Sequence, residues 1–482
     1  MARTPDPRPV LPIKLDSTSN GEFAPVALDG AARAARACAH AALDDAARRL
    51  GQERRRYLVS LLGAAATLGA FNRAFAAAGR DGGRYALPPE APYEMAAAQS
   101  ALAGDEFILD VQLHHVNPQG AWRRRAGPDA FRGMPNSRCG QADHVECFSS
   151  GALLKEVFLD SDTAMGVLSH VPGGDDANPL DFDAADATRD AANALDGTER
   201  LLLHGRCMPT LPGELERLGE QAARRRVAAI KTYTQFGPPD GAEGFFLDDE
   251  RFGTPFVERV RSLGVKTIAV HKGLPFGPRG HVYSLARDIG PAARRHPDMT
   301  FLVYHAGFDP AVKEGPYDPN AKAGVDVLLR SMREAGNPPN VYAELGSTWR
   351  YVMRDPDQAA HLLGKLLATF GAERILWGTD SIWYGSPQDQ IQAFRAFQIA
   401  PRLQDRHGYA ALTPAVKRKV FGLNAARVYG IEPDRMRAKL STDRVQKRRS
   451  DYLQDPQPTF ATYGPRTWPE FVALRRMQGG TP

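Results

Sequence analysis

FILDVQLHHV, residues 107–116, is the stretch from which the fold of this chain can be predicted. It begins with an apolar run, Phe107 to Leu109, and passes directly into polar side chains that include Gln112 and His114. Apolar runs of this kind are typical of strands buried in a parallel sheet. Buried polar groups cost free energy when they have no partner. The stretch therefore predicts a buried strand whose carboxyl end carries functional side chains.

Seven further stretches repeat this pattern, with helix-like segments between most of them. The strands are expected at 107–114, 163–171, 200–208, 228–235, 267–274, 300–307, 340–347 and 375–381. Helices are expected at 151–160, 182–196, 214–226, 254–263, 283–295, 323–335 and 357–370. Eight strands that alternate with helices predict a (β/α)8 barrel of the TIM type. The alternative, a doubly wound open sheet, would place a glycine-rich phosphate turn after the first strand, and QLHHVNPQG contains none.

Length and composition fit one large domain with extensions. The chain has 482 residues, 43% of them hydrophobic, and a net charge of +5 that comes from dispersed Lys and Arg residues, so nucleic-acid binding is not expected. We expect an N-terminal extension at 1–53 that is disordered and then helical, a signal-like segment at 54–78, a flexible linker at 79–104, the barrel at 105–432 and a C-terminal extension at 433–482.

The signal-like segment resembles a twin-arginine export signal. Arg54 and Arg55 are followed, after one residue, by Tyr57 and Leu58, then by an apolar stretch and by small-residue cleavage sites near residues 74–78. This layout predicts export to the periplasm. The apolar stretch is too short and too rich in Ala and Gly to predict a stable membrane span. The alternative is a helix that packs on the domain of a cytoplasmic protein.

The carboxyl ends of the predicted strands carry the residues that can perform chemistry. In a barrel of this type, catalytic groups lie at these ends. The candidates are Gln112 and His114 on the first strand, Lys231 on the fourth, His271 on the fifth, His305 on the sixth, Glu344 on the seventh and Asp380 on the eighth. We therefore expect these side chains to meet at one end of the barrel.

With these candidates in place, the chain resembles the amidohydrolase superfamily, specifically its amidohydrolase-2 branch of metal-dependent hydrolases and decarboxylases. The resemblance covers about residues 105–432 and includes YHAGF at 304–308, WGTDSIW at 377–383 and NAARVYG at 424–430. Ligand-type residues also end the first, fifth, sixth and eighth strands in the family order.

The resemblance implies one divalent metal, zinc or alternatively manganese. Its ligands would be His114, His271 and Asp380, three protein groups that leave a position open for water. One departure concerns the first strand, which in the family usually reads D-x-H-x-H and here reads D-V-Q-L-H, so that Gln112 takes the place of a histidine. An amide oxygen is a weaker zinc ligand than an imidazole, so Gln112 is expected to be a weak fourth ligand or to orient the water.

Other residues are expected to move protons or to contact the substrate. His305 and Asp380 are the acid–base candidates. The pKa of histidine lies near neutrality, which suits His305 to proton transfer. Lys231 and Glu344 are expected to contact substrate, unless they pair with each other as a structural bridge. Arg123, in the long loop at 117–148, could hold a substrate carboxylate or could simply be solvated. Cys139 and Cys147 of the same loop could form a disulfide.

The function predicted from these residues is hydrolysis of an ester, lactone or amide of a small organic substrate, in which metal-activated water attacks the carbonyl. One alternative is non-oxidative decarboxylation of an aromatic or unsaturated carboxylic acid. Another is an exported binding protein without catalysis, in which Gln112 marks a decayed metal site. The basic and Pro-rich C-terminal extension could wrap the barrel or contact a second subunit in a homodimer.

Overall fold

The predicted barrel is confirmed by a computed structural model, which describes residues 11–126, 143–172, 178–194, 199–236, 244–275 and 281–477. Eight parallel strands follow one another in a single sheet. They are β2 (Leu109–Leu113), β3 (Met165–Leu168), β4 (Leu201–Arg206), β5 (Ala229–Tyr233), β6 (Thr267–His271), β7 (Thr300–Tyr304), β8 (Val341–Glu344) and β9 (Ile375–Leu376). The backbone N–H of Val111 donates to the carbonyl of Trp377 at 3.0 Å, and a parallel bridge joins Leu113 to Ser381, which brings the first and last strands together.

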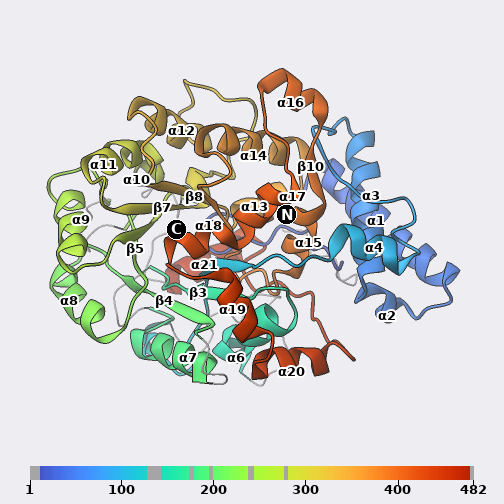
Figure 1. The fold of residues 1–482 in the computed structure, drawn as a ribbon, viewed down its shortest axis with the longest axis horizontal. Helices are drawn as coiled ribbons and strands as arrows, with labels where there is room; N and C mark the ends of the chain where they lie inside the picture. Colours follow the sequence, from blue (N-terminus) through green and yellow to red (C-terminus); the bar gives the residue numbers. More distant parts are fainter. Residues whose placement is uncertain are drawn as a thin grey trace.

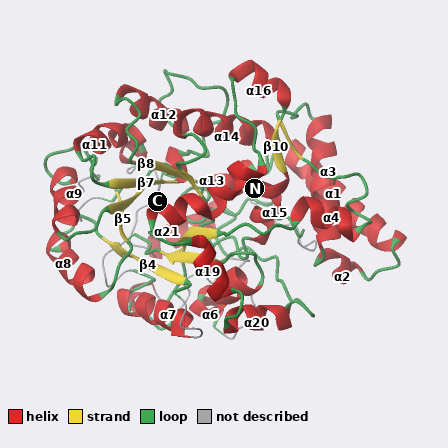
Figure 2. Ribbon diagram, viewed as in Figure 1, coloured by secondary structure: helices red, strands yellow, loops and turns green. Residues whose placement is uncertain are grey.

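Helices surround the strands, as Figure 2 shows. Those nearest the predicted positions are α6 (Ser150–Leu154), α7 (Phe182–Ala194), α8 (Glu214–Arg224), α9 (Gly253–Ser262), α11 (Ile289–Arg295), α12 (Val325–Glu334) and α14 (Pro356–Phe370), with α15 (Gln388–Ala396) after β9. Shorter helices are α5 (Trp122–Ala126), α10 (His281–Ser284), α13 (Thr348–Val352), α16 (Pro401–His407), α17 (Pro414–Arg418) and α18 (Asn424–Val428).

The strands are apolar on both faces because each face meets a separate part of the core. On β7, Leu302 and Tyr304 belong to one hydrophobic cluster, whereas Phe301 and Val303 belong to another that includes residues of the surrounding helices. Successive strand residues point to opposite faces, so one set fills the barrel and the other packs outward. This explains why the strands read as continuous apolar runs in the sequence.

The N-terminal region forms a helical layer on one side of the barrel. It contains α1 (Gly30–Arg49), α2 (Arg54–Leu58), α3 (Leu61–Ala77) and α4 (Met95–Leu102), drawn in blue in Figure 1. The signal-like segment is α2 and α3, and Leu68, Phe71 and Phe75 of α3 are buried in the same hydrophobic cluster as Phe394 of α15. The segment is therefore a helix packed on the domain in this structure.

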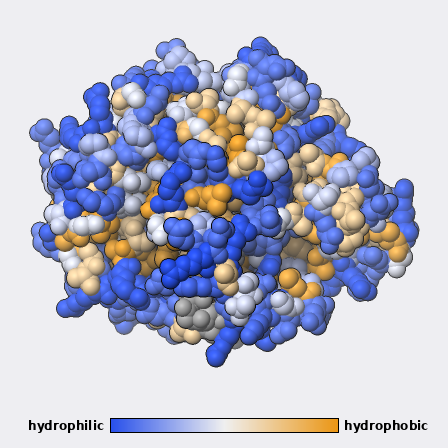
Figure 3. Space-filling model, in the orientation of Figure 1, coloured by the Kyte–Doolittle hydropathy of each residue, from blue (hydrophilic) through white to orange (hydrophobic). Residues whose placement is uncertain are grey.

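No helix within the described ranges combines the length and the apolar character that crossing a bilayer requires. Figure 3 shows hydrophilic side chains over most of the visible face, with apolar ones in scattered groups.

The segment at 79–104 is ordered by pairing, whereas the sequence predicted a flexible linker. Its strand β1 (Gly83–Tyr85) pairs antiparallel with β10 (Phe397–Ile399). The side chain of Asn72 in α3 makes two hydrogen bonds to the backbone of Tyr85. Its Nδ2 donates to the Tyr85 carbonyl at 2.7 Å, and its Oδ1 accepts from the Tyr85 N–H at 2.9 Å. The glycines that suggested flexibility instead allow a close approach, since a Cβ on Gly83 would lie 2.3 Å from the Phe397 ring.

The N-terminal arm, residues 11–23, is buried in this structure, whereas the sequence predicted disorder before the first helix. Leu11, Ile13 and Leu15 are at most 3% exposed. The ammonium of Lys14 lies 3.3 Å from the Asp389 carboxylate, and both side chains are 2% exposed. The arm has no helix or strand of its own, and these tertiary contacts hold it in place. Its polar composition alone is that of a disordered tail.

Asp16 fixes the next part of the arm. Its carboxylate accepts from the Arg350 guanidinium at 2.9 Å. Burial would raise the pKa of Asp16, but the charges of Arg350 and Arg466 and the hydrogen bonds from Thr18 together outweigh burial and lower the pKa to about 2. Asp16 is therefore ionised throughout the neutral range.

The C-terminal extension wraps the barrel, which is one of the two predicted arrangements. It contains α19 (Pro433–Leu440), α20 (Arg444–Tyr452) and α21 (Trp468–Met477). The N–H of Ser19 in the arm donates to the Pro465 carbonyl at 2.9 Å, and the hydroxyl of Thr18 donates to that of Thr462 at 2.9 Å. The N-terminal arm and the C-terminal extension thus lie side by side.

We predict that Lys14→Met loosens the arm. The change leaves Asp389 buried without its cation, which should lower the free energy of unfolding by about 3–5 kcal/mol. Chemical denaturation measures the loss, and limited proteolysis should reveal new cleavage within residues 11–29. The control is Lys266→Met, whose side chain is 58% exposed and 3.5 Å from Asp298; it should change stability by less than about 0.5 kcal/mol. Equal stability and equal protease resistance in the two variants would show that the arm is not anchored by Lys14.

Candidate metal centre

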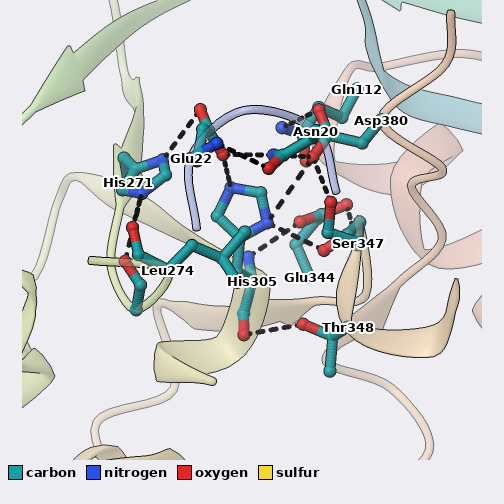
Figure 4. A network of polar contacts seen from close by, with 12 residues as sticks. Asn20, Glu22, Gln112, His271, Leu274, His305, Glu344, Ser347, Thr348 and Asp380 are labelled. Carbon is teal, nitrogen blue, oxygen red and sulfur yellow. Dashed lines mark hydrogen bonds and ion pairs between the residues drawn. The ribbon is translucent and has the colours of Figure 1, made fainter. Parts of the chain in front are cut away.

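The polar residues expected at the strand ends meet at one end of the barrel, where most of them are seen in Figure 4. Gln112 lies in β2 and His114 follows it, His271 ends β6, His305 follows β7, Glu344 ends β8 and Asp380 comes after β9. All of these side chains are at most 1% exposed. The carboxyl ends of the strands therefore enclose a buried polar cluster.

The backbone around this cluster adopts unusual conformations. Left-handed φ angles occur shortly after β6 at Leu274 (40°), after β7 at His305 (65°), after β8 at Ser347 (56°) and after β9 at Asp380 (61°). Each such non-glycine residue costs about 1–3 kcal/mol, and residues of this kind gather at binding and catalytic sites. The turns redirect the chain at the barrel mouth and bring His305 and Asp380 into the cluster.

Each of three histidines is fixed by a backbone carbonyl. The Nδ1 of His114 lies 2.7 Å from the Ser169 carbonyl, and the Nδ1 of His305 lies 2.8 Å from that of Gly346. The Nε2 of His271 lies 3.1 Å from the Gly273 carbonyl. A carbonyl can only accept, so each of these nitrogens carries the hydrogen and, in the neutral ring, the other nitrogen keeps its lone pair. Histidines that bind metals are oriented in this way.

The other nitrogen of each ring is turned toward a carboxylate. The Nε2 of His114 is 3.1 Å from Asp380 Oδ1. The Nε2 of His305 is 3.3 Å from Glu22 Oε2, and the Nδ1 of His271 is 3.5 Å from Glu22 Oε1. A nitrogen lone pair and a carboxylate oxygen repel each other unless a proton or a metal ion lies between them. The cluster is therefore built to hold positive charge.

Two residues of the cluster, Asn20 and Glu22, come from the N-terminal arm, and sequence reasoning missed them. The side-chain amide of Asn20 donates to Glu22 Oε2 at 2.5 Å and to Asp380 Oδ2 at 2.7 Å. Gly21 between them has a φ of 90°, which turns both side chains into the barrel mouth. The Ser-Asn-Gly sequence could have predicted a turn here, but nothing in it indicates which part of the chain the turn would meet.

Gln112 contributes a hydrogen-bond donor to the cluster. Its Nε2 donates to Asp380 Oδ1 at 2.8 Å and lies 3.4 Å from His114 Nε2. Its Oε1 faces the backbone at Gly346, where a Cβ would come within 2.1 Å of that oxygen. In this orientation the amide oxygen points away from His114 and Asp380, and the amide nitrogen positions Asp380.

The charges of the cluster are strongly coupled. Burial alone would raise the pKa of Asp380, but its contact with His114 and the nearby His305 lower it to about 2. Burial alone would lower the pKa of His305, yet Glu22, together with Asp380 and Glu344, raises it. Burial, the neighbouring His305 and Lys231 lower the pKa of His271. Asp380 is therefore ionised at neutral pH, His305 favours its protonated form and His271 its neutral form.

The predicted substrate contacts have different surroundings. Lys231 is fully buried, its ammonium lies 3.6 Å from the centre of the Tyr304 ring, and it has no hydrogen-bond partner among the residues described. Burial lowers its pKa to about 8. Glu344, whose pKa burial raises to about 7, accepts the N–H groups of Gly346 at 2.6 Å and His305 at 3.0 Å. Lys231 can thus meet an anionic group, whereas Glu344 supports the backbone beneath His305.

The loop residues lie apart from this network. Arg123 pairs with Asp143 and donates to the Pro118 carbonyl at 3.0 Å, so its guanidinium is used within the loop. Cys147 is in a disulfide, while Cys38 and Cys207 are free thiols. Cys139 lies outside the described residues.

A metal could be held by Glu22, His271 and His305. Within the described part of the chain, these three form a group whose ligand atoms all lie within 4.8 Å of one another. His114 and Asp380 lie next to them, joined through Asn20. Imidazole nitrogens and carboxylate oxygens are the ligands expected of a zinc or manganese site.

Comparison with known proteins gives a family and several structures of similar fold. No curated protein matches the chain in sequence. An uncharacterised TIM-barrel protein from Bordetella bronchiseptica is similar in fold, with a TM-score of 0.43 and 16% identity over 69% of this chain and 99% of that one. A 2,6-dihydroxybenzoate decarboxylase from Rhizobium has a TM-score of 0.40 and 16% identity over 68% of this chain and 99% of its own. An amidohydrolase from Burkholderia multivorans has a TM-score of 0.41 and 18% identity over 68% of this chain and 100% of its own. A family model described as amidohydrolase matches residues 155–431, more than half of the chain. The chain therefore belongs to the amidohydrolase family of enzymes.

Proposed function

We propose that this chain is a hydrolase that uses one bound divalent metal, zinc or alternatively manganese, to cleave an ester, lactone or amide of a small organic substrate. The observation that carries the proposal is the arrangement of His114, His271 and His305. Each ring donates one N–H to a backbone carbonyl and turns its other nitrogen toward a buried carboxylate. This is the orientation that a metal-binding histidine needs.

The ligands supplied by the barrel strands would be His114, His271 and Asp380. Asp380 is ionised at neutral pH, as a ligand must be, since its pKa is lowered to about 2. When bound, the metal would lower the pKa of a water molecule and polarise the substrate carbonyl. The donor from Gln112 keeps Asp380 in place from the other side.

His305 is the best candidate for the general acid. Its Nδ1 is held by the Gly346 carbonyl at 2.8 Å, so its Nε2 is the nitrogen that can exchange a proton. The raised pKa of His305 favours the protonated form, which can donate to a leaving group. Lys231, a buried cation over the Tyr304 ring, would attract a substrate that carries an acidic group.

A decarboxylase is the second candidate, and the same two residues favour it. A protonated His305 could deliver a proton to the carbon that loses CO₂, and Lys231 could pair with the carboxylate before it leaves. A binding protein with a decayed metal site is the third candidate, and it would hold neither zinc nor manganese.

Two measurements on the purified full-length chain test the proposal. Elemental analysis should find about one zinc or manganese ion per chain. A screen of esters, lactones and amides, run in parallel with aromatic and unsaturated carboxylic acids under CO₂ detection, should show hydrolysis that a chelator abolishes. Release of CO₂ without hydrolysis would establish the decarboxylase instead, and a chain that takes up no metal would refute both.

We predict that His271→Ala loses the metal and keeps the fold. The side chain ends a rigid strand and faces Glu22, so its removal should weaken metal binding more than the roughly 10–100-fold that loss of an orienting partner costs. The control is His296→Ala, a buried histidine before β7 that pairs with Glu258. Elemental analysis and circular dichroism compare the two variants. Full metal occupancy in His271→Ala would remove that residue from the site.

Export remains a prediction of the sequence, and the N-terminus of the active protein tests it. A cleaved signal would give a periplasmic chain that begins near Ala77 or Gly79, and changing both Arg54 and Arg55 to Lys would keep it in the cytoplasm. The burial of α3 supports the alternative of a retained helix. We therefore expect mass spectrometry of the active protein to find residues 11–23. A start near Ala77 would contradict this and would show that the arm is removed.

A further inference from the structure

The N-terminal arm is held firmly on both sides of Glu22. Before it, Lys14 pairs with Asp389, and Ser19 donates to the Pro465 carbonyl at 2.9 Å. After it, Phe23 is 4% exposed and its ring packs edge-on against that of Tyr351, with 6.1 Å between the ring centres. The Glu22 carboxylate is therefore a fixed part of the barrel mouth, although it lies far from the strands in the sequence.

Glu22 lies at distances that suit two ligands of the same ion better than they suit hydrogen bonds. Its two oxygens are 3.5 Å from His271 Nδ1 and 3.3 Å from His305 Nε2. A hydrogen bond between an imidazolium and a carboxylate is shorter, about 2.7–2.9 Å. Ligands about 2.0–2.1 Å from a tetrahedral zinc ion lie roughly 3.3–3.4 Å from one another. In addition, His305 Nε2 is fully buried and has no hydrogen-bond partner within the described residues.

Negative charge around Glu22 also calls for a cation. Glu22 and Asp380 both accept from the Asn20 amide, at 2.5 and 2.7 Å, so two carboxylates approach one neutral group. Buried carboxylates cost free energy unless a positive charge compensates them. Figure 4 shows that Glu22 lies between the two imidazole rings, where a cation would reach all three groups.

We propose that the N-terminal arm completes the metal site and that Glu22 is a metal ligand together with His271 and His305. The inference rests on the proposed metal-dependent function and revises its site, because it assigns a ligand to a segment outside the barrel. In the revised site His305 Nε2 binds the ion instead of exchanging a proton, and Asp380, paired with His114 at 3.1 Å, is the group left to move protons. The arm would then be required for metal binding in the same chain, and removal of residues before the barrel would remove part of the site.

Metal titration of the full-length chain tests the role of Glu22. The protein is stripped with a chelator, and zinc is added back in competition with a chromophoric chelator; the absorption of bound Co²⁺ reports the ligand geometry independently of activity. Glu22→Gln, which keeps the size of the side chain and removes its charge, should bind zinc at least about 100-fold more weakly and change the Co²⁺ spectrum. The matched control, Glu53→Gln, changes an exposed glutamate of the same N-terminal region and should match the parent.

The remaining variants separate the possible outcomes. If Glu22→Gln does not fold, Glu22→Asp retracts the carboxylate by one methylene and should still weaken zinc binding and alter the Co²⁺ spectrum. Parent-like zinc affinity in Glu22→Gln, with loss of zinc in His271→Ala, would overturn this inference and leave the proposed function intact. A parent chain that binds no zinc and no manganese would refute the proposed function and this inference together.

Discussion

Burial of carboxylates beside histidines is the constraint on which the barrel mouth depends. Asp380 is fully buried and Glu22 nearly so, and the two lie against three imidazole rings whose other nitrogens are already committed to backbone carbonyls. Such a cluster is stable only if positive charge resides in it. Protons on the imidazoles and the buried ammonium of Lys231 can supply part of that charge, and a divalent cation can supply more of it at one point.

The barrel and the arm make different contributions to this cluster. The strand ends supply the histidines and Asp380 on a rigid frame, and the left-handed turns after β7 and β9 set their directions. The arm supplies Glu22 and Asn20 and is held by contacts with the C-terminal extension. The N-terminal arm, which sequence reasoning treated as an addition to the catalytic domain, thus takes part in the polar network of the barrel mouth, and the C-terminal extension helps to hold it there.

The barrel could be predicted because its strands carry a local signal. Each is a short apolar run followed by polar or glycine residues, and the parallel arrangement brings His114, His271, His305 and Asp380 to one end whatever the details of the loops. The arm carries no such signal. Asn20 contacts Asp380, 360 residues further along, and β1 pairs with β10 across more than 300 residues.

The segment at 54–78 shows a different limit of sequence reasoning. An export signal requires an apolar helix rich in Ala and Leu. The same composition also lets a helix pack between α1 and α15. In the structure Phe71 and Phe75 are buried against the domain, which is the arrangement expected of a packed helix, while export stays a prediction. Gln112 shows the same limit, because the sequence does not indicate whether the oxygen or the nitrogen of its side-chain amide faces Asp380.

Anomalous X-ray diffraction from crystals of the full-length protein grown with zinc would test the central claim most directly. Data collected on both sides of the zinc absorption edge locate the ion independently of any assumption about its ligands. The account predicts a single strong peak about 2.0–2.2 Å from nitrogens of His271 and His305 and from an oxygen of Glu22. A barrel mouth without an anomalous peak, or a peak bound solely by residues outside the arm, would contradict it.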